Sequence, residues 1–518
     1  MSNLSMNLRR LGRIAVVLAR HGLAHLAGAG LERWPRLARR LPPAGLSGPE
    51  RLRTVVEDLE GTFVKFGQML ALQPDILPAA YCNALYDLLD RMAPFAYEQV
   101  EKTFVEELGQ TPAEIFDSFE VEPLATASVA QVHVAYLDGR KFAVKVQRPN
   151  AEENFAGDIR LMMAGIRLLR VLRLQSLYWV VELMSEFINW TQEELDFHCE
   201  ARYMDHLRRN AHDNTSERVP TLLREYTTRR TLVVEYLEGV TILDYLRALE
   251  KNDEGTLRRL REDGFDADVF AAHIIENFFG DVFRNGLFHA DLHPANLLIL
   301  PGNVVGYVDF GISGLLSVYA RRKMVAMTLA CTRADLEGLC AAFFDISAVD
   351  ANSDTLGFRR GIEAFSEKWF EVRGGEPQMR QNFTLVMLDM VKLSRRTGVW
   401  PDRDVVKYLR SSIAIDGLIT RFAPDFSVGQ YVGQIAARHL SWEARQSLLT
   451  HNSLIDWSNS SARLLRNGAE RVIGFLDRLS SGELGGVAER AAPDRGLRLR
   501  ALCLTAVVFA VSLGTVIK

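Results

Sequence analysis

The sequence predicts an α+β protein of two lobes, in which a small strand-rich lobe precedes a larger helical one. Two alternating apolar runs on either side of Asp138-Gly139 predict strands, and helical patterns dominate after residue 241. A set of Asp and Asn side chains at fixed spacing between residues 291 and 309 predicts an active-site loop beyond the first strands. With 518 residues, the chain is long enough to bury more than one core.

The composition is that of an ordinary globular protein. With 48% hydrophobic and 24% charged residues, wholesale disorder is excluded. The five cysteines include no CxxC pair, which argues against a disulfide framework and a zinc site and fits a reducing cytoplasmic setting. The early apolar run 14–19 ends at Arg20 and is too short for the core of a signal peptide.

The first two segments are predicted to be helical. Residues 1–49 are strongly basic, because eight Arg and a single acid, Glu32, lie among the first 40 residues. A helix over 8–28 would lie on an anionic membrane surface or pack on the protein itself, and the sequence does not choose between the two. Residues 50–122 have a helical pattern punctuated by four prolines.

Residues 123–240 are predicted to form the small lobe. The two alternating runs form a β-hairpin around the Asp138-Gly139 turn, helical sequence follows from residue 151, and a strand over 231–236 closes the sheet.

The segment from His289 to Asn296, followed by Asp309-Phe310-Gly311, has the spacing of a kinase catalytic loop and metal loop. Asn296 follows Asp291 by five residues, and Asp309 follows it by 18. Phosphoryl transfer requires Mg²⁺ held against ATP by hard oxygen ligands, and a carboxylate beside the attacking hydroxyl or water. We therefore expect ATP and Mg²⁺ as cofactors, Asp309 and Asn296 as metal ligands, and Asp291 as the residue that orients the nucleophile.

A second group of residues is expected to contact the nucleotide. Lys145 follows Ala143-Val144, as does the strand lysine that neutralises the α- and β-phosphates in kinases, and Glu200 is its best candidate partner. Glu235, near the end of the closing strand, is assigned to the same group. The preceding loop holds alanine where the kinase phosphate loop has glycine, and each Cβ restricts how closely the backbone approaches phosphate. The residues of this loop are Ala125, Thr126, Ala127, Ser128, Val129 and Ala130.

Together these residues resemble the UbiB-type atypical kinases, a family associated with ubiquinone (coenzyme Q) biosynthesis, from about residue 50 to about residue 430. Lys65-Phe66-Gly67-Gln68 matches the family's KxGQ signature, residues 125–130 its alanine-rich loop, and Glu194-Leu195-Asp196 its ExD motif. The segment from Phe422 to Phe426 resembles a recurrent late segment. No ordinary protein kinase carries the first three motifs.

The resemblance implies a bilobal protein-kinase-like fold whose helical KxGQ extension covers the active site. It implies that Lys65 and Gln68 reach the nucleotide region and restrict access, and that Glu194 and Asp196 meet them there as regulatory residues. Ala290 replaces the arginine that pairs with a phosphorylated activation loop, and no Ala-Pro-Glu follows the metal loop. The resemblance also implies an occluded protein-substrate groove, with ATP hydrolysis or transfer to a small molecule as the reaction, and these two departures agree with it.

The C-terminal part is predicted to contain a helical lobe over 241–479, a linker over 480–496 and a transmembrane anchor over 497–518. Residues 501–517 carry no charge, and three arginines lie just upstream of them. By the positive-inside rule these arginines keep the kinase-like domain on the cytoplasmic side of the inner membrane. A buried core helix is the alternative interpretation of the apolar run.

The sequence thus predicts an Mg-ATP-dependent atypical kinase or ATPase that supports ubiquinone biosynthesis at the membrane, with Asp291, Lys145 and Glu200 as its catalytic residues. The alternatives are a nucleotide-gated prenyl-lipid-binding or scaffolding protein, and a true protein kinase with an open acceptor groove. The expected partners are membrane lipids or prenylated quinone precursors and other ubiquinone-biosynthesis proteins. No nucleic acid is expected.

Overall fold

The computed structural model describes a large part of the chain, and its contacts divide the chain into two compact units, residues 1–440 and 441–518. The fold below is that of the first unit. The predicted linker 480–496 and membrane anchor 497–518 lie outside the described residues, and no helix among those described is both long and apolar enough to cross a membrane. The described residues are 10, 12–14, 16–17, 19–21, 46–71, 77–86, 88, 94–127, 129–149, 151–171, 178–349, 353–373, 376–379 and 383–449.

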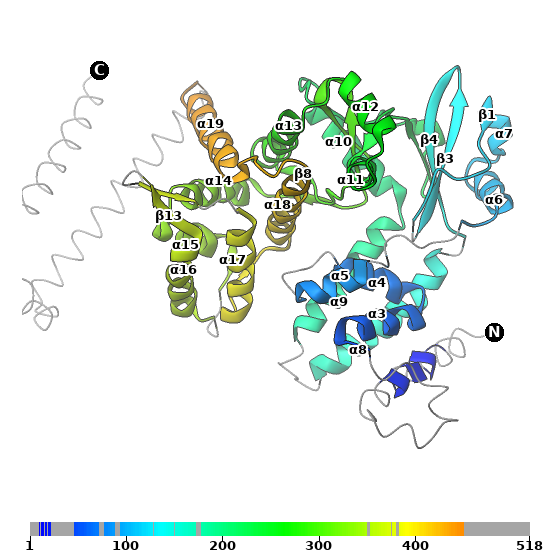
Figure 1. The fold of residues 1–518 in the computed structure, drawn as a ribbon. Coiled ribbons are helices and arrows are strands. Elements are labelled where there is room, and N and C mark those ends of the chain that lie inside the picture. The colour runs from blue at the N-terminus through cyan, green and yellow to red at the C-terminus, as the bar shows by residue number, and fades with distance from the viewer. Residues whose placement is uncertain are drawn as a thin grey trace, which may run out of the picture. The chain divides into compact units, whose positions relative to one another are not determined.

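The small lobe is built on a five-stranded antiparallel sheet of order β1-β3-β4-β6, with β2 pairing β3 (Figure 1). The predicted hairpin is confirmed, because β3 and β4 pair along their whole length around Asp138 and Gly139. These two turn residues have φ angles of 50° and 72°, as a two-residue type I′ turn requires. The closing strand is confirmed as β6. The strands are β1 (Ser118–Phe119), β2 (Ala125–Thr126), β3 (Ala130–Leu137), β4 (Arg140–Gln147) and β6 (Thr231–Glu235).

Two helices ahead of the sheet, α6 (Tyr97–Leu108) and α7 (Pro112–Ile115), pack against it. Phe104 and Phe116 meet edge to face, with ring centroids 6.2 Å apart, and both belong to a core that includes Val144 of β4. The packing of the small lobe therefore begins at least as early as α6.

Five further helices form a layer with its own core (Figure 1), in which α3 to α5 lie beside α8 and α9. The layer is closely packed at Gly67, where a Cβ would come within 2.7 Å of the Val56 side chain and 2.8 Å of the Leu88 side chain. The helices are α3 (Gly48–Leu59), α4 (Thr62–Ala71), α5 (Ala79–Tyr86), α8 (Ala151–Val171) and α9 (Tyr178–Glu194).

The described residues of the N-terminal segment contact this layer. The Arg10 guanidinium lies 2.7 Å from the Asp158 carboxylate of α8, and the His21 ring lies 3.0 Å from Asp58 of α3. His21 is buried. At these positions the segment follows the alternative in which it packs on the protein itself.

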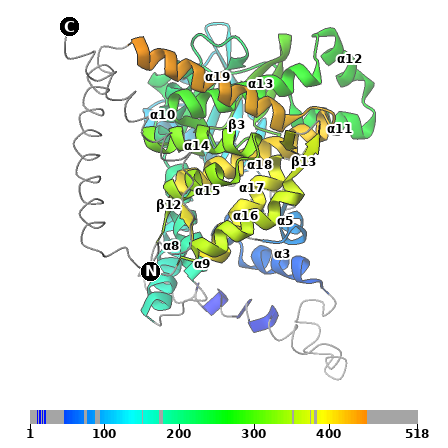
Figure 2. The same cartoon turned by 90° about the vertical axis from the view of Figure 1, so that its left-hand side faces the viewer.

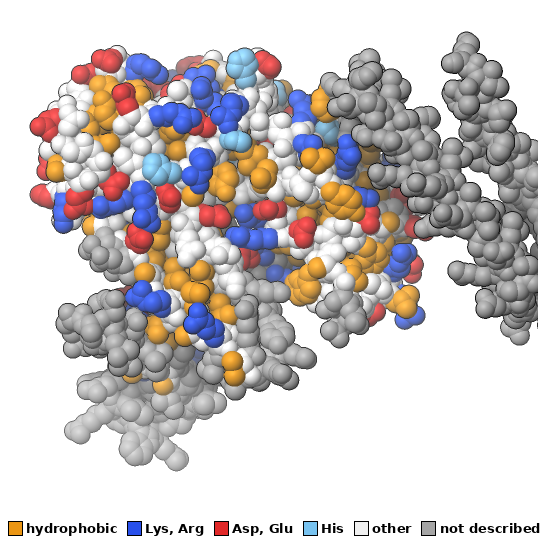
Figure 3. All heavy atoms as spheres, turned by 180° about the vertical axis from the view of Figure 1, so that it is seen from behind, with side chains coloured by type: hydrophobic (Ala, Val, Ile, Leu, Met, Phe, Trp, Pro, Cys, Tyr) orange, Lys and Arg blue, Asp and Glu red, His pale blue; other side chains and the backbone are white. Residues whose placement is uncertain are grey.

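The large lobe is mainly helical, as the sequence predicts, and helices α14 to α17 are grouped together in it (Figure 2). On the face shown in Figure 3, basic and acidic side chains are interspersed. The helices are α10 (Phe197–Asn210), which joins the lobes, then α11 (Ile242–Lys251), α12 (Glu254–Glu262), α13 (Ala267–Gly280), α14 (Val318–Thr332), α15 (Leu336–Asp345), α16 (Thr355–Trp369), α17 (Phe383–Thr397), α18 (Arg403–Phe422) and α19 (Val428–Leu449).

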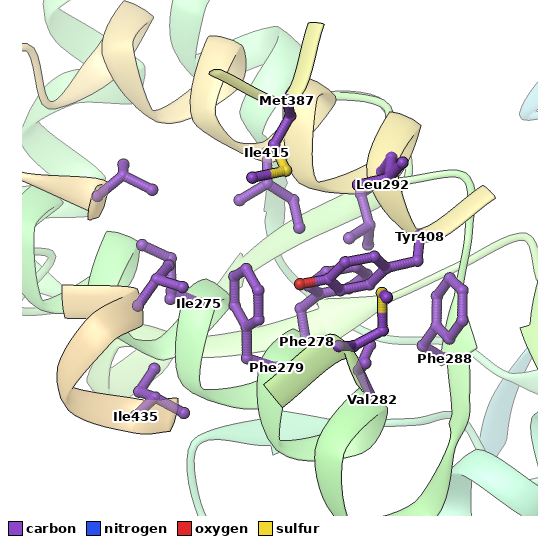
Figure 4. Packing of buried hydrophobic residues seen from close by; sticks show 14 of the residues in the cluster. Ile275, Phe278, Phe279, Val282, Phe288, Leu292, Met387, Tyr408, Ile415 and Ile435 are labelled. Atoms are coloured by element: carbon purple, nitrogen blue, oxygen red, sulfur yellow. The ribbon is translucent and has the colours of Figure 1, made fainter. Parts of the chain in front are cut away.

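Aromatic side chains anchor α18 in the core of this lobe (Figure 4). The Tyr408 ring stacks on Phe278, with centroids 6.0 Å apart, and meets Phe279 and Phe288 edge to face. Aromatic contacts of this kind add to the free energy gained from area burial alone. The position of α18 is therefore well determined by its buried face.

Short strands that the sequence pattern did not predict carry the loops of the large lobe. One sheet has the order β5-β10-β9-β7, and β8 pairs separately with β11. These strands are β5 (Glu217–Arg218), β7 (Val240–Thr241), β8 (Leu287–His289), β9 (Leu297–Leu300), β10 (Val304–Tyr307) and β11 (Ser313–Leu315), and two small pairs lie farther on, β12 (Ser347–Ala348) with β15 (Trp400–Pro401) and β13 (Phe370–Arg373) with β14 (Glu376–Met379).

Candidate active site

Two strand pairs bring the predicted catalytic and metal loops together. In the antiparallel pair β9–β10, Tyr307 lies opposite Leu297, so the residues that flank these positions, Asn296 and Val308, are neighbours. The Val308 N–H donates to the Asn296 carbonyl oxygen at 3.0 Å. In the pair β8–β11, the strand before Asp291 lies beside the strand after the metal loop. Residues far apart in sequence thus lie next to one another.

A buried ion pair joins β4 to α10. The Lys145 ammonium donates to both carboxylate oxygens of Glu200, at 3.1 and 3.0 Å. The Glu200 side chain is only 5% exposed, and it also accepts the backbone N–H of Phe310 at 3.1 Å. A single carboxylate therefore fixes the strand lysine and the metal loop relative to one another.

Lys145 also reaches the metal loop directly. Its ammonium lies 3.3 Å from the Asp309 carboxylate, whose side chain is 43% exposed. Burial alone would lower the pKa of Lys145, but the Asp309 and Glu200 carboxylates outweigh it and raise that pKa above its ordinary value. Burial likewise opposes ionisation of Asp309, but the Lys145 ammonium and the Gly311 N–H lower the pKa of this carboxyl. Both groups are therefore charged at neutral pH.

Asp309 has a strained backbone, with a φ of 61° that few residues other than glycine adopt. Strain of this kind persists only where the surroundings impose it, and it is frequent at ligand sites. Here it presents the carboxylate to the cleft between Lys145 and the catalytic loop.

The catalytic loop is held together by the side chain of Asn296. Its amide nitrogen donates to the Asp291 backbone carbonyl and to the Asp291 carboxylate, each at 3.1 Å. Burial and the nearby Asp309 and Glu194 charges raise the pKa of Asp291 to about 7. A carboxyl with such a pKa is suited to accept a proton from a substrate hydroxyl near neutral pH.

The residues present fit a magnesium ion that is held partly by phosphates. Among the described residues, no group of three His, Cys, Asp or Glu side chains could hold a metal on its own. Mg²⁺ is usually bound by one or two carboxylates with substrate phosphates and water. Asp309 supplies an ionised carboxylate, and because the Asn296 nitrogen is bonded to Asp291, its amide oxygen is the atom that could face a cation.

The Lys65 ammonium is buried, 2% exposed, and forms an ion pair with the Glu194 carboxylate. It also lies 5.2 Å from the centre of the Trp190 ring and 5.7 Å from that of Phe155. Burial lowers the pKa of Lys65, and the Glu194 carboxylate only partly offsets this. The structure thus brings together Lys65 and Glu194, which the resemblance had paired.

The other two regulatory candidates contact nearby protein groups. The Gln68 amide donates to the backbone carbonyl of Leu88 at 2.7 Å, inside the helical layer. Asp196 caps α10 by accepting the His198 N–H at 3.0 Å. The contacts of both side chains are therefore local and structural.

Glu235 and the alanine-rich loop are also engaged in protein contacts. Glu235 forms an ion pair with Arg218 at 2.6 Å and accepts the Thr221 N–H. Within the loop, Ala127 donates to the Ala130 carbonyl at 2.7 Å, and the Arg148 guanidinium donates to the Ala127 carbonyl at 3.0 Å. The loop is thus held by one internal hydrogen bond and one from Arg148. Ala125 and Thr126 form β2, Val129 and Ala130 are buried in the core of the helical layer, and Ser128 lies outside the described residues.

Contacts from α18 support the site, and the sequence motifs did not reveal them. The Lys407 ammonium donates to the Ser313 carbonyl at 2.9 Å, just after the metal loop. The Ser411 hydroxyl is 3.3 Å from the Ala290 carbonyl, next to Asp291. Both residues lie more than 90 positions from the loops they touch, and their spacing on one helix face was the only available signal.

Comparison with known proteins agrees with this geometry. Residues 87–343 match the ABC1 atypical kinase-like domain. A protein named probable protein kinase UbiB from Aeromonas hydrophila is 31% identical over 436 residues, which cover 82% of this chain and 77% of that protein. The chain belongs to the UbiB family of ABC1 atypical kinase-like proteins. The matched domain is a kinase-like phosphotransferase domain.

Further relatives extend the similarity to other bacteria. The probable protein kinase UbiB of Cellvibrio japonicus is 32% identical, with 81% of this chain and 75% of that protein covered. An uncharacterised protein in the hydrogenase 1 5′ region of Clostridium pasteurianum is 27% identical over 81% of this chain and 74% of its own length. Among solved structures, the complex of Rv3197 with erythromycin from Mycobacterium tuberculosis is 21% identical and aligns over 79% of this chain and 98% of that chain, with a TM-score of 0.46.

Proposed function

We propose that this chain binds Mg-ATP between Lys145 and Asp309 and either hydrolyses it or transfers its terminal phosphoryl group to a small acceptor. The observation that carries the proposal is the contact of one ammonium with two carboxylates, 3.0 Å from Glu200 of α10 and 3.3 Å from Asp309 of the metal loop. Phosphoryl transfer depends on positioning and on charge stabilisation more than on covalent chemistry. A lysine, a metal-binding carboxylate and a proton acceptor in one cleft are the parts that it needs.

Each side chain has a separate task in this proposal. Lys145, oriented by Glu200, binds the α- and β-phosphates, while Asp309 and the Asn296 oxygen hold magnesium. When bound, the magnesium ion neutralises charge on the β- and γ-phosphates. Asp291 orients the attacking hydroxyl or water and accepts its proton.

A small acceptor is favoured over a protein acceptor. The Lys65–Glu194 ion pair links α4 to α9 beside the cleft. Because the pair is buried, separating the two side chains would leave an unpaired buried charge, which costs free energy. The chain also lacks the arginine and the Ala-Pro-Glu segment on which regulated protein kinases depend. A true protein kinase is the second candidate, and it requires transfer to a protein without prior replacement of Lys65.

The proposed biological role is in ubiquinone biosynthesis at the inner membrane, with the kinase-like domain in the cytoplasm. Similarity to proteins named UbiB supports the pathway, and the uncharged run 501–517 supports a membrane anchor. Membrane lipids, prenylated quinone precursors and other enzymes of the pathway are the proposed partners. Deletion of the gene with quinone profiling tests this role, since normal quinone levels in the deletion strain would contradict it.

Asp309→Asn tests the nucleotide site. Asparagine tolerates a positive φ, so the variant keeps the loop backbone but loses the metal-binding charge. We expect Mg-dependent nucleotide binding and turnover to be lost, as measured by calorimetry and ADP release. Asp117→Asn, an exposed position in the small lobe, is the matched control. Full Mg-ATP turnover by the Asp309 variant would refute the proposal.

A further inference from the structure

A cavity of about 330 Å³ opens beside the catalytic loop, and Asp291 forms part of its wall. Met69 of α4, Trp190 of α9 and Leu418 of α18 contribute apolar surface to it. Small-molecule sites in proteins are typically mostly apolar pockets of roughly 300–1,000 Å³ with a few polar groups. The cavity is therefore large enough for a small organic molecule, and the proton acceptor of the proposed reaction lies in its wall.

One stripe of α18 forms a side of the cavity. Six of the lining residues recur at alternating spacings of four and three, which places them on one face of the helix. Basic residues begin and end the stripe, and the two small residues that follow Arg410 leave space beside the helix. In order, the stripe reads Arg403, Lys407, Arg410, Ala414, Gly417 and Arg421.

The helix that carries this stripe is fixed from behind. Tyr408 packs in the aromatic core of the lobe (Figure 4), and Ser411 lies 3.3 Å from the carbonyl of Ala290. The stripe is therefore held at a set distance from the catalytic loop, and the cavity between them does not depend on a ligand to form.

The charge of the lining favours an anion. Four basic and two acidic side chains line the cavity. The Arg410 guanidinium is matched by Glu186 at 2.9 Å, and Lys407 lies 3.5 Å from Asp404. Arg403 and Arg421, at the two ends of the stripe, are exposed, and Arg421 lies 3.8 Å from Glu250. The 18 positions of helix that separate them place their Cα atoms roughly 27 Å apart. A molecule in the middle of the cavity has a cation on either side of it.

We propose that this cavity is the acceptor site, and that it takes a small amphipathic anion with an apolar body, an anionic group directed to the basic ends of α18, and a hydroxyl facing Asp291. This inference rests on the proposed Mg-ATP site and names the class of its substrate. The hydroxyl oxygen attacks the γ-phosphorus, and the bond from that phosphorus to the β,γ-bridging oxygen breaks. ADP leaves, and the Asp291 carboxylate takes the hydroxyl proton.

Gly417→Leu tests the site by filling it. Gly417 lines the cavity, and a Cβ there meets no atom within 4 Å, so a larger side chain begins in open space. Thr420→Leu is the matched control, because Thr420 is exposed on the same helix and does not line the cavity. The probe is 10-hydroxydecanoate, compared with the neutral 1,10-decanediol, and binding to the full chain is measured by calorimetry. Mass spectrometry after incubation with Mg-ATP measures its phosphoester.

We expect wild type and Thr420→Leu to bind and phosphorylate 10-hydroxydecanoate, and the diol to bind roughly tenfold more weakly because it lacks a charge-assisted hydrogen bond. Gly417→Leu should lose binding of the probe and keep its affinity for Mg-ADP. Equal binding of the probe by Gly417→Leu and wild type, or equal binding of probe and diol, would overturn the site. Binding without phosphoester, in a protein that binds Mg-ATP, would overturn its role as the acceptor site. If wild type fails to bind Mg-ATP, the proposed nucleotide site is refuted instead. Calorimetry with the probe alone does not depend on that nucleotide site.

Discussion

Asp291→Asn should stabilise the nucleotide-free protein in a way that depends on pH. The surroundings raise the pKa of Asp291 from its ordinary 3.8 to about 7, so the folded protein holds a proton that the unfolded chain has lost. The free energy of unfolding therefore falls as pH rises from about 4 to about 7, and it is constant above that range. At 1.36 kcal/mol for each pKa unit, the raised pKa of Asp291 lowers the free energy of unfolding by about 2 kcal/mol at pH 5 and about 4 kcal/mol at pH 8, relative to an unshifted carboxyl and as an upper limit. The asparagine variant does not pay this cost, and it keeps an oxygen for the Asn296 hydrogen bond.

Thermal unfolding in EDTA at several pH values measures this effect, because a bound cation would favour the ionised carboxylate. We expect the Tm of Asp291→Asn to exceed that of wild type by a margin that grows between pH 5 and pH 7 and then levels off. The exposed Asp117→Asn should show no such trend. Asp291→Asn should also lower Mg-ATP turnover by about 10²-fold or more, since a positioned proton acceptor contributes on that order. A Tm difference that is independent of pH, or a variant less stable than wild type at pH 8, would refute the reasoning.

Three other substitutions probe the supports of the cleft. Lys145→Met should lower Mg-ATP turnover by about 10²-fold or more in a steady-state assay, because it removes a preorganised cation from the phosphates, and unchanged turnover would contradict its role. Gly67→Ala should lower the Tm through overpacking worth about 1–3 kcal/mol, whereas Gly417→Ala, which enters open space, should not; equal Tm values would show that the layer yields at Gly67. Lys65→Met should be destabilising by about 3–5 kcal/mol, and adding Glu194→Gln should recover much of that loss. Additive changes in the unfolding free energy would show that these two side chains are not coupled.

The sequence was most informative where chemistry fixes both residue type and spacing. Asp291, Asn296 and Asp309 were recognisable because a kinase loop needs a carboxylate, an amide and a second carboxylate at set distances along the chain. The hairpin was predictable because Asp138-Gly139 adopts the left-handed conformations of its turn. The kinase-like α+β fold follows from these local signals.

The sequence was less informative where a side chain had several partners of similar chemistry. Gln68 could donate to a phosphate or to a carbonyl, and only the packing of the helical layer brings the Leu88 carbonyl within 2.7 Å. Asp196 could bind a cation or cap a helix, and the start of α10 decides for the cap. The short strands of the large lobe were also missed, since runs of two to four residues are too brief to establish a period.

Lys65 interacts with both the wall of the cavity and the metal loop. Its ammonium pairs with Glu194 and lies 5.2 Å from the Trp190 ring, while Trp190 and the neighbouring Met69 also form the wall of the cavity. The negative charge of Asp309 also acts on Lys65, opposing the effect of its burial on the pKa. A molecule that displaces Trp190 would therefore change the surroundings of a buried cation that responds to both Glu194 and the metal loop. Because the same two helices, α4 and α9, wall the cavity and hold this cation, we expect a molecule in the cavity to affect the Lys65–Glu194 ion pair.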